Sequence, residues 1–310
     1  MPTIRVANAP VSWGILEFEG LPAKTYGWSE VLDEIAATGY AGTELGDYGF
    51  LPTDSARLRA ELDRRGLTML GAFVPVAFGN EAAHAAGEEH ALKVARLLAA
   101  TAGDSPTRPF IVLADDNAAD PARALNAGRA TPDLALSPAE LRTFAEGVER
   151  VARRVRDETG LPSVFHHHSA SFVETPAEID AFLAATDPDL VGLIFDTGHY
   201  AYGAGPAYDG DIVAALDCYG DRIRYVHFKD LDPALARQSR AEGWDYMTAI
   251  RHGIFSELGT GGVDFPAAVD WLRRHGYDGW IVVEQDVLPG MGSPRESAER
   301  NRAYLRSIGL

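Results

Sequence analysis

The chain has 310 residues, of which 46% are hydrophobic and 24% are charged, a composition that excludes disordered, collagen-like and coiled-coil proteins. Its net charge of −17 argues against binding to nucleic-acid phosphates or to anionic membranes. The single cysteine, Cys218, the lack of a membrane-length apolar run and the absence of a signal-peptide pattern predict a soluble, cytoplasmic protein.

Short apolar runs alternate with longer amphipathic stretches, which predicts strands that are each followed by a helix. We expect strands at Ile4–Ala9, Gly42–Leu45, Thr68–Val74, Phe110–Ala114, Ser163–His166, Val191–Phe195, Arg224–Phe228 and Trp280–Glu284. The expected helices are Trp28–Thr38, Ser55–Arg65, Glu88–Ala102, Pro138–Thr159, Pro176–Ala185, Asp209–Tyr219, Pro266–His275 and Pro294–Ile308. Eight such units without a break in composition predict an α/β protein with one (β/α)8 TIM-barrel domain over residues 1–310.

The alternative fold is an open, doubly wound sheet with a nucleotide site. That fold would need a Gly-x-Gly-x-x-Gly turn after the first strand, where this chain has Asn-Ala-Pro-Val-Ser-Trp-Gly at positions 8–14. The chain also lacks a Walker-type Gly-x-x-x-x-Gly-Lys sequence. The barrel is therefore the favoured fold.

Two connections are long for a barrel. Asp115–Ser137 is rich in Asp, Ala and Asn, and we expect it to form a solvated excursion. Leu231–Gly262 follows the seventh strand and contains Trp244, Tyr246 and Phe255. A loop of this length on the catalytic face is typical of a lid or of an oligomer contact, and the sequence leaves both interpretations open.

Metal-binding residue types gather at the predicted carboxyl ends of the strands, where barrel enzymes carry their active sites. Strand alternation allows Asp196, His227 and Glu284 to converge with either His166 or His168. Each motif alone could be a run of polar surface residues or a turn. Four strand ends that each offer a ligand type at the same level of the barrel favour a metal site. Mixed carboxylate and imidazole ligands suit Mn²⁺, Co²⁺, Fe²⁺ or Zn²⁺, and with water ligands also Mg²⁺.

The same residues resemble those of the xylose-isomerase-like TIM barrels, a superfamily of sugar isomerases and epimerases that also contains AP endonucleases. The resemblance is carried by Asp196–His199, His227–Asp230 and Glu284. A closer resemblance to the inosose dehydratases is carried by Ala9–Gly14, Gly39–Gly46, His166-x-His168, Val173–Asp180 and Trp280–Asp286. Because it spans nearly the whole chain, the resemblance implies the same barrel fold and one divalent metal.

The resemblance implies a metal held by Asp196, His227 and Glu284, with His166 in the place of a glutamate on the fifth strand. Sugar epimerases and isomerases of this fold use two glutamates that exchange a proton across an enediolate. An imidazole in place of one glutamate can instead pass a proton to a leaving hydroxide near neutral pH. The chain departs from its dehydratase relatives at Ser169–Ser171, where they carry a Gly-Thr pair.

The resemblance therefore implies a manganese-dependent lyase of inositol breakdown that dehydrates an inosose or a related keto-polyol, with cobalt, iron, zinc or magnesium as alternative metals. It implies catalytic roles for His166, His168, Glu284 and Lys229, and substrate contacts for Trp13, Glu44 and His199. The alternative is a sugar or sugar-phosphate isomerase or epimerase that uses the same metal site. A third, less favoured function is a lyase that carries out β-elimination on a 3-keto-glycoside. The net negative charge disfavours an AP endonuclease, which must bind nucleic-acid phosphates. The set of metal ligands at four strand ends disfavours a barrel without enzymatic activity. A homo-oligomer is compatible with the sequence.

Overall fold

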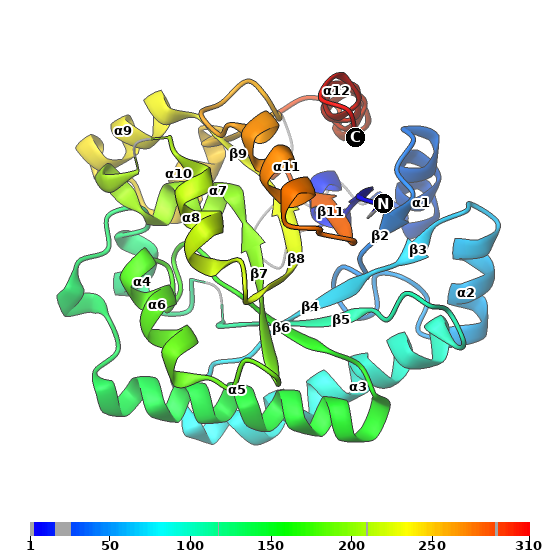
Figure 1. Ribbon diagram of the computed structural model, residues 1–310, viewed down its shortest axis with the longest axis horizontal. Coiled ribbons are helices and arrows are strands. Elements are labelled where there is room, and N and C mark those ends of the chain that lie inside the picture. The colour runs from blue at the N-terminus through cyan, green and yellow to red at the C-terminus, as the bar shows by residue number, and fades with distance from the viewer. Residues whose placement is uncertain (1–2, 16–25, 117, 209, 289–290) are drawn as a thin grey trace.

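Parallel strands form one sheet in the order β3-β2-β1-β11-β8-β7-β6-β5-β4 (Figure 1). The computed structural model describes residues 3–15, 26–116, 118–208, 210–288 and 291–310. The strands of this sheet are β1 Arg5–Asn8, β2 Gly42–Thr43, β3 Thr68–Met69, β4 Gly71–Pro75, β5 Phe110–Ala114, β6 Ser163–His166, β7 Val191–Asp196, β8 Ile223–Phe228 and β11 Trp280–Val283.

The sheet closes at Leu70, which separates β3 from β4. The Leu70 N–H donates to the Thr43 carbonyl at 3.0 Å, and the Leu70 carbonyl accepts from the Phe110 N–H at 2.8 Å. β3 and β4 are therefore the two parts of the single strand predicted at Thr68–Val74, and together they join β2 to β5. The eight strand positions confirm the predicted TIM barrel.

The eight predicted helices are all present, with ends within a few residues of those expected. They are α1 Trp28–Ala37, α2 Ser55–Asp63, α3 His84–Ala102, α5 Pro138–Thr159, α6 Pro176–Ala185, α8 Ile212–Tyr219, α11 Phe265–Arg274 and α12 Pro294–Ser307. Capping boxes begin α5 and α6, and α3 packs beside α5 along one side of the barrel (Figure 1). The predicted start of α8, Asp209, lies outside the described residues.

Inward-facing side chains fill the barrel immediately below the rim that carries the predicted metal ligands. Val164, Ile194, Tyr225 and Val282 belong to one buried cluster inside the sheet. Each lies two positions before one of the predicted ligands His166, Asp196, His227 and Glu284. Because strand side chains alternate between faces, each ligand points the same way as the core residue that precedes it.

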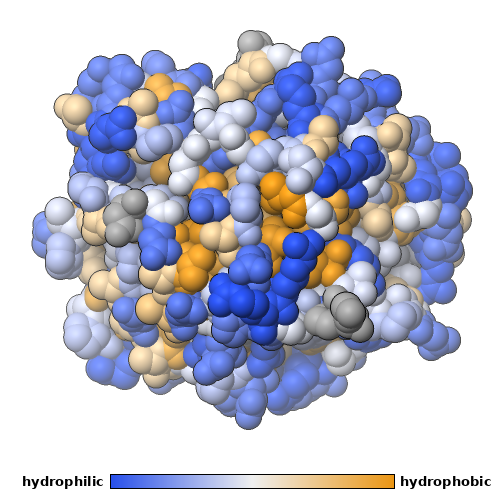
Figure 2. All heavy atoms as spheres, turned by 45° about the horizontal axis from the view of Figure 1, so that its top comes forward, coloured by the Kyte–Doolittle hydropathy of each residue, from blue (hydrophilic) through white to orange (hydrophobic). Residues whose placement is uncertain are grey.

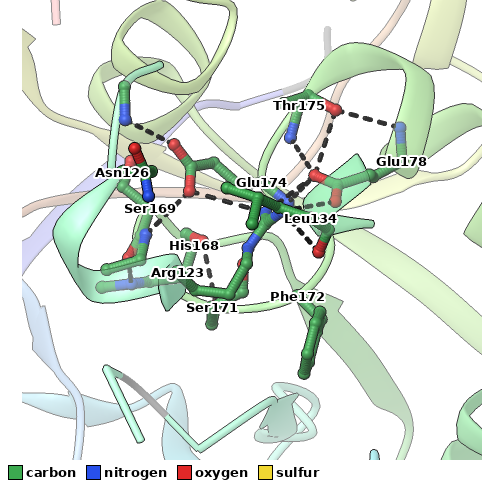
Figure 3. Close-up of polar contacts among 12 residues, drawn as sticks. Arg123, Asn126, Leu134, His168, Ser169, Ser171, Phe172, Glu174, Thr175 and Glu178 are labelled. Carbon is green, nitrogen blue, oxygen red and sulfur yellow. Dashed lines mark hydrogen bonds and ion pairs between the residues drawn. The ribbon is translucent and has the colours of Figure 1, made fainter. Parts of the chain in front are cut away.

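Much of Asp115–Ser137 is exposed, as predicted for a solvated excursion, but the segment also folds and is anchored by a buried side chain. This segment forms α4, Pro121–Leu125, and the 3₁₀ turn Pro132–Leu134. Arg123 of α4 is 1% exposed, and its guanidinium donates to both carboxylate oxygens of Glu178 at 2.8 and 2.9 Å (Figure 3). The Arg123 Nε–H donates to the Ser171 carbonyl at 3.0 Å, which ties the segment to the loop after β6.

The second long connection, Leu231–Gly262, is also folded. It contains β9 Asp230–Leu231, α9 Pro233–Glu242, α10 Tyr246–Arg251 and β10 Phe255–Ser256, and β9 pairs antiparallel with β10. Tyr246 and Phe255 are each 2% exposed. The aromatic residues noted in the sequence are therefore packed against the rest of the chain.

The face shown in Figure 2 is largely hydrophilic, with hydrophobic side chains visible near its centre. Of the described residues, Leu125 and Met291 are the large hydrophobic side chains that are exposed, at 54% and 38%. Among the helices that the structure describes, none is both long enough and apolar enough to cross a membrane.

Replacing Arg123 by methionine is expected to destabilise the protein by about 3–5 kcal/mol, because fully buried Glu174 would lose the cation that lies 3.6 Å away. The matched control is Arg295→Met, since Arg295 pairs with Glu299 on the surface and should contribute no more than about 1 kcal/mol. Chemical denaturation of the two variants measures both values. Equal losses of stability would contradict a structural role for the buried pair.

Candidate metal centre

Four side chains from four strand ends converge at the carboxyl rim of the barrel. Each offers one ligand atom, and these atoms all lie within 4.8 Å of one another in the set His166, Asp196, His227 and Glu284. The first three side chains are at most 2% exposed, and that of Glu284 is 13% exposed. The structure thus brings His166, rather than His168, into the predicted group of ligands.

The geometry identifies which atoms face one another. His166 Nε2 and His227 Nδ1 each lie 3.8 Å from Asp196 Oδ2, and His227 Nδ1 lies 3.2 Å from Glu284 Oε1. Within the described part of the chain, buried Asp196 Oδ2 and His227 Nδ1 have no hydrogen-bond partner. Buried polar atoms are costly to leave unpaired, and carboxylate oxygens and imidazole nitrogens are ordinary metal ligands. The residues therefore fit a divalent metal ion.

A second layer of contacts fixes the orientation of these side chains. His227 Nε2 lies 2.9 Å from Glu44 Oε1 and donates its proton to that carboxylate, which leaves Nδ1 as the nitrogen that would bind a metal ion after losing its own proton. Asp196 Oδ1 accepts from the His199 N–H at 2.8 Å, as the N-cap of α7, Thr197–Gly203. The backbone N–H of Asp196 donates to His167 Nε2 at 3.3 Å. Glu44, predicted to contact substrate, therefore also contacts a predicted ligand.

Burial and neighbouring charges act in opposite directions on the pKa of each group in the set. Burial lowers the pKa of His227, but the carboxylates of Glu284 and Glu44 outweigh burial and hold the pKa well above its ordinary value. Burial raises the pKa of Glu284, but His227 and Lys229 hold it well below its ordinary value. The same balance at Asp196, where burial is opposed by His166 and Lys229, lowers the pKa of its carboxyl.

Lys229 lies buried between acidic and imidazole groups. Its Nζ is 3.3 Å from Asp286 Oδ1, 3.4 Å from Glu284 Oε2 and 3.3 Å from His199 Nε2. Burial lowers the pKa of the ammonium group, but the carboxylates of Asp286 and Glu284 raise it above its ordinary value. Lys229 is therefore the cation that partly offsets the carboxylates of the rim.

His168 and His199 stack on each other with ring centroids 3.8 Å apart, and both are buried. His168 Nδ1 lies 2.6 Å from the Ser169 carbonyl, and its Nε2 lies 3.4 Å from Tyr246 Oη. A carbonyl only accepts, so Nδ1 carries the proton and Nε2 accepts from the tyrosine hydroxyl. Burial, reinforced by His166 and Lys229, lowers the pKa of His168 well below its ordinary value.

A pocket opens beside the four clustered residues. Its described lining includes the predicted residues Glu44, His166, His168, Lys229 and Glu284, together with Phe73, Tyr246, Asp47 and Asp286. Two other predicted substrate contacts lie apart from this lining. Trp13 is buried and donates its indole N–H to Glu34 at 2.6 Å, and His199 lies behind His168.

Sequence reasoning did not select Tyr246 or Asp286 for the site. Asp286 had a usable signal, since it lies two positions after Glu284 and strand alternation puts both side chains on one face. Tyr246 had none, because its neighbour His168 is 78 residues away in the chain and the two meet through folding of α10.

A closed parallel barrel with a buried carboxylate–imidazole cluster at its carboxyl rim defines an α/β barrel protein with its active site at that rim. Residues 32–308 match the xylose isomerase-like TIM barrel family, and the chain belongs to this family. Relatives of this chain at 30% identity or more include inosose dehydratases, and the protein is an enzyme of this metal-dependent, sugar-converting family.

Two relatives are similar over nearly their full length. An inosose dehydratase from Geobacillus kaustophilus is 33% identical over 303 residues, which cover 97% of this chain and 93% of that protein. An inosose dehydratase from Lacticaseibacillus casei is 31% identical over 311 residues, covering 98% and 96%. The solved structure of an L-ribulose 3-epimerase shares the fold, with a TM-score of 0.69 at 17% identity over 99% of this chain and 94% of that one.

The contacts of His168 predict its protonation state. At pH 6 an imidazole in water is mostly protonated, because its pKa is about 6.5, whereas burial keeps His168 and His199 neutral. Long-range ¹H–¹⁵N NMR is expected to show neutral His168 with its proton on Nδ1. The unfolded chain takes up these protons near pH 6.5 and the folded chain does not, so this pair lowers stability as the pH falls below that value. An imidazolium signal for His168 at pH 6 would contradict the geometry.

Proposed function

We propose that the protein is a divalent-metal-dependent lyase that removes water from an inosose, such as 2-keto-myo-inositol, or from a related keto-polyol. The observation that carries the proposal is the donor set, in which the imidazole of His166 stands at the end of β6 and Glu284 is the one glutamate. The matched pair of glutamates that would exchange a proton is thus incomplete in this set, which favours elimination over symmetric proton return, with the proton carried by the nearby imidazole of His168. The inosose dehydratases at about 30% identity support the same reaction.

The charge of the pocket supports an uncharged substrate over a sugar phosphate. The described lining carries the carboxyl groups of Glu44, Asp47, Glu284 and Asp286 against the single ammonium group of Lys229. No arginine is found in the part of the lining that the structure describes. A phosphate in this pocket would be repelled, whereas polyol hydroxyls can donate hydrogen bonds to carboxylates.

A divalent ion bound to the four clustered residues would supply Lewis acidity, which stabilises the enolate formed when a proton leaves the carbon beside a carbonyl. The other residues hold these groups in position. Glu44 keeps His227 in the tautomer with a free Nδ1, and Lys229 pairs with Glu284 Oε2 so that Oε1 faces the cluster. These contacts favour a fixed arrangement of charge before the substrate arrives.

His168 is the group that we propose to move the proton. It lines the pocket and, in its neutral form, has one lone pair at Nε2, so the 3.4 Å contact with the Tyr246 hydroxyl opens before Nε2 takes a proton. Nε2 takes the proton from the carbon beside the carbonyl, and the electrons of that C–H bond form the enolate. When the β carbon–oxygen bond breaks, the leaving hydroxide takes the same proton from Nε2 and departs as water. His168 returns to its neutral state, and the product has lost one water.

Incubation of the metal-loaded protein with 2-keto-myo-inositol in D₂O tests the reaction type. Dehydration predicts a product that is one water lighter, detected by mass spectrometry together with the release of water. Deuterium incorporation without loss of water would instead assign an isomerase or epimerase and would contradict the proposal.

The variant His168→Gln tests the proton transfer. Because a positioned acid–base group contributes about 10²- to 10⁴-fold to rate, kcat is expected to fall by that factor while the bound metal is retained. The matched control is His252→Gln on the exposed end of α10, which should leave kcat unchanged. Loss of metal from His168→Gln would place His168 among the ligands and contradict the assigned role.

A further inference from the structure

Asp286 is a buried carboxylate in the pocket to which the proposed reaction assigns no role. It lies two residues beyond Glu284 where the chain continues from β11, it is 4% exposed, and it lines the pocket beside Lys229 and Tyr246. Its two oxygens have different surroundings. Oδ1 is 3.3 Å from Lys229 Nζ, whereas buried Oδ2 has no hydrogen-bond partner among the residues that the structure describes.

Lys229 contacts one of these oxygens and leaves the other unpaired. Its Nζ lies 3.3 Å from Asp286 Oδ1 and 3.4 Å from Glu284 Oε2, and Oδ2 has no donor among the described residues. A carboxylate oxygen buried without a donor costs free energy, and such atoms in native proteins usually have a hydrogen-bond partner. The unused capacity for hydrogen bonding at this end of the pocket therefore belongs to Asp286.

We propose that Asp286 Oδ2 accepts a hydrogen bond from a hydroxyl group of the substrate, which makes Asp286 a binding and specificity-determining residue. The identity of the ligand as a polyol rests on the proposed function, but the hydrogen bond itself does not require dehydration. A carboxylate accepts and does not donate, so it selects a hydroxyl over a carbonyl or a phosphate oxygen. A ligand without that hydroxyl leaves Oδ2 buried and unpaired, and is rejected.

The alternative is that Asp286 only holds the charge of Lys229. Asp286→Asn separates the two roles because the ammonium of Lys229 attracts the amide oxygen toward itself. The amide NH₂ then occupies the position of Oδ2 and presents donors where an acceptor is needed. The contact with Lys229 is kept while acceptance from a hydroxyl is lost.

Calorimetric titration of the metal-loaded protein with myo-inositol and its monodeoxy derivatives provides the test, since these polyols bind without reacting. One monodeoxy derivative is expected to bind wild-type protein about 10- to 100-fold more weakly than myo-inositol. Asp286→Asn is expected to weaken binding of myo-inositol by the same factor and to abolish that preference. The control Asp270→Asn, an equal change of charge on the exposed face of α11, should behave as wild type.

A preference retained in Asp286→Asn, or no binding of myo-inositol by wild-type protein, overturns the proposal. If the variant does not fold, a crystal structure of the wild-type complex decides, because a hydroxyl oxygen must lie within about 3 Å of Oδ2. If the protein does not dehydrate 2-keto-myo-inositol but wild type still prefers myo-inositol to one monodeoxy derivative, the proposed function is overturned and the binding role of Asp286 stands. If the protein dehydrates 2-keto-myo-inositol but shows no such preference, the binding role is overturned and the proposed function stands.

Discussion

Two carboxylates, Asp196 and Glu284, are held inside the protein, where negative charge is far more costly than in water unless it is paired. The rest of the site is arranged around this constraint. Lys229 supplies positive charge from the residue after β8, and the divalent ion that the cluster fits would supply the remainder. The barrel makes the arrangement possible because parallel strands bring their carboxyl ends to one rim.

The same constraint explains the residues that lie behind the rim. Glu44 accepts from His227 and thereby frees the nitrogen that faces the carboxylates, while the start of α7 binds the second oxygen of Asp196. Such outer contacts fix both the tautomer and the orientation of ligands. Burial beside Lys229 keeps the imidazole of His168 neutral. His168 is therefore available for the proposed proton transfer, while Lys229 compensates the negative charge of the carboxylates.

Local sequence patterns predicted most of the barrel and the clustered residues. Phe110–Ala114 and Pro138–Thr159 have the predicted bounds because apolar periodicity and helix caps are local signals. Long-range pairing was not predictable. Arg123 is charged and lies in a segment rich in small and polar residues, which is typical of exposed chain. Its contacts with Glu178, Glu174 and the Ser171 carbonyl, all distant in the sequence, accompany its burial. Tyr246 reaches the pocket through α10, for which the sequence predicted no helix.

The central claim is that four strand ends form one divalent-metal site. Elemental analysis of protein purified without chelator, beside His227→Ala, tests it most directly. The account predicts about one Mn, Co, Fe or Zn per wild-type chain, in keeping with the carboxylate and imidazole donors, and none in the variant. A folded wild-type protein that takes up no stoichiometric metal, even after reconstitution, would contradict the account and the lyase mechanism together.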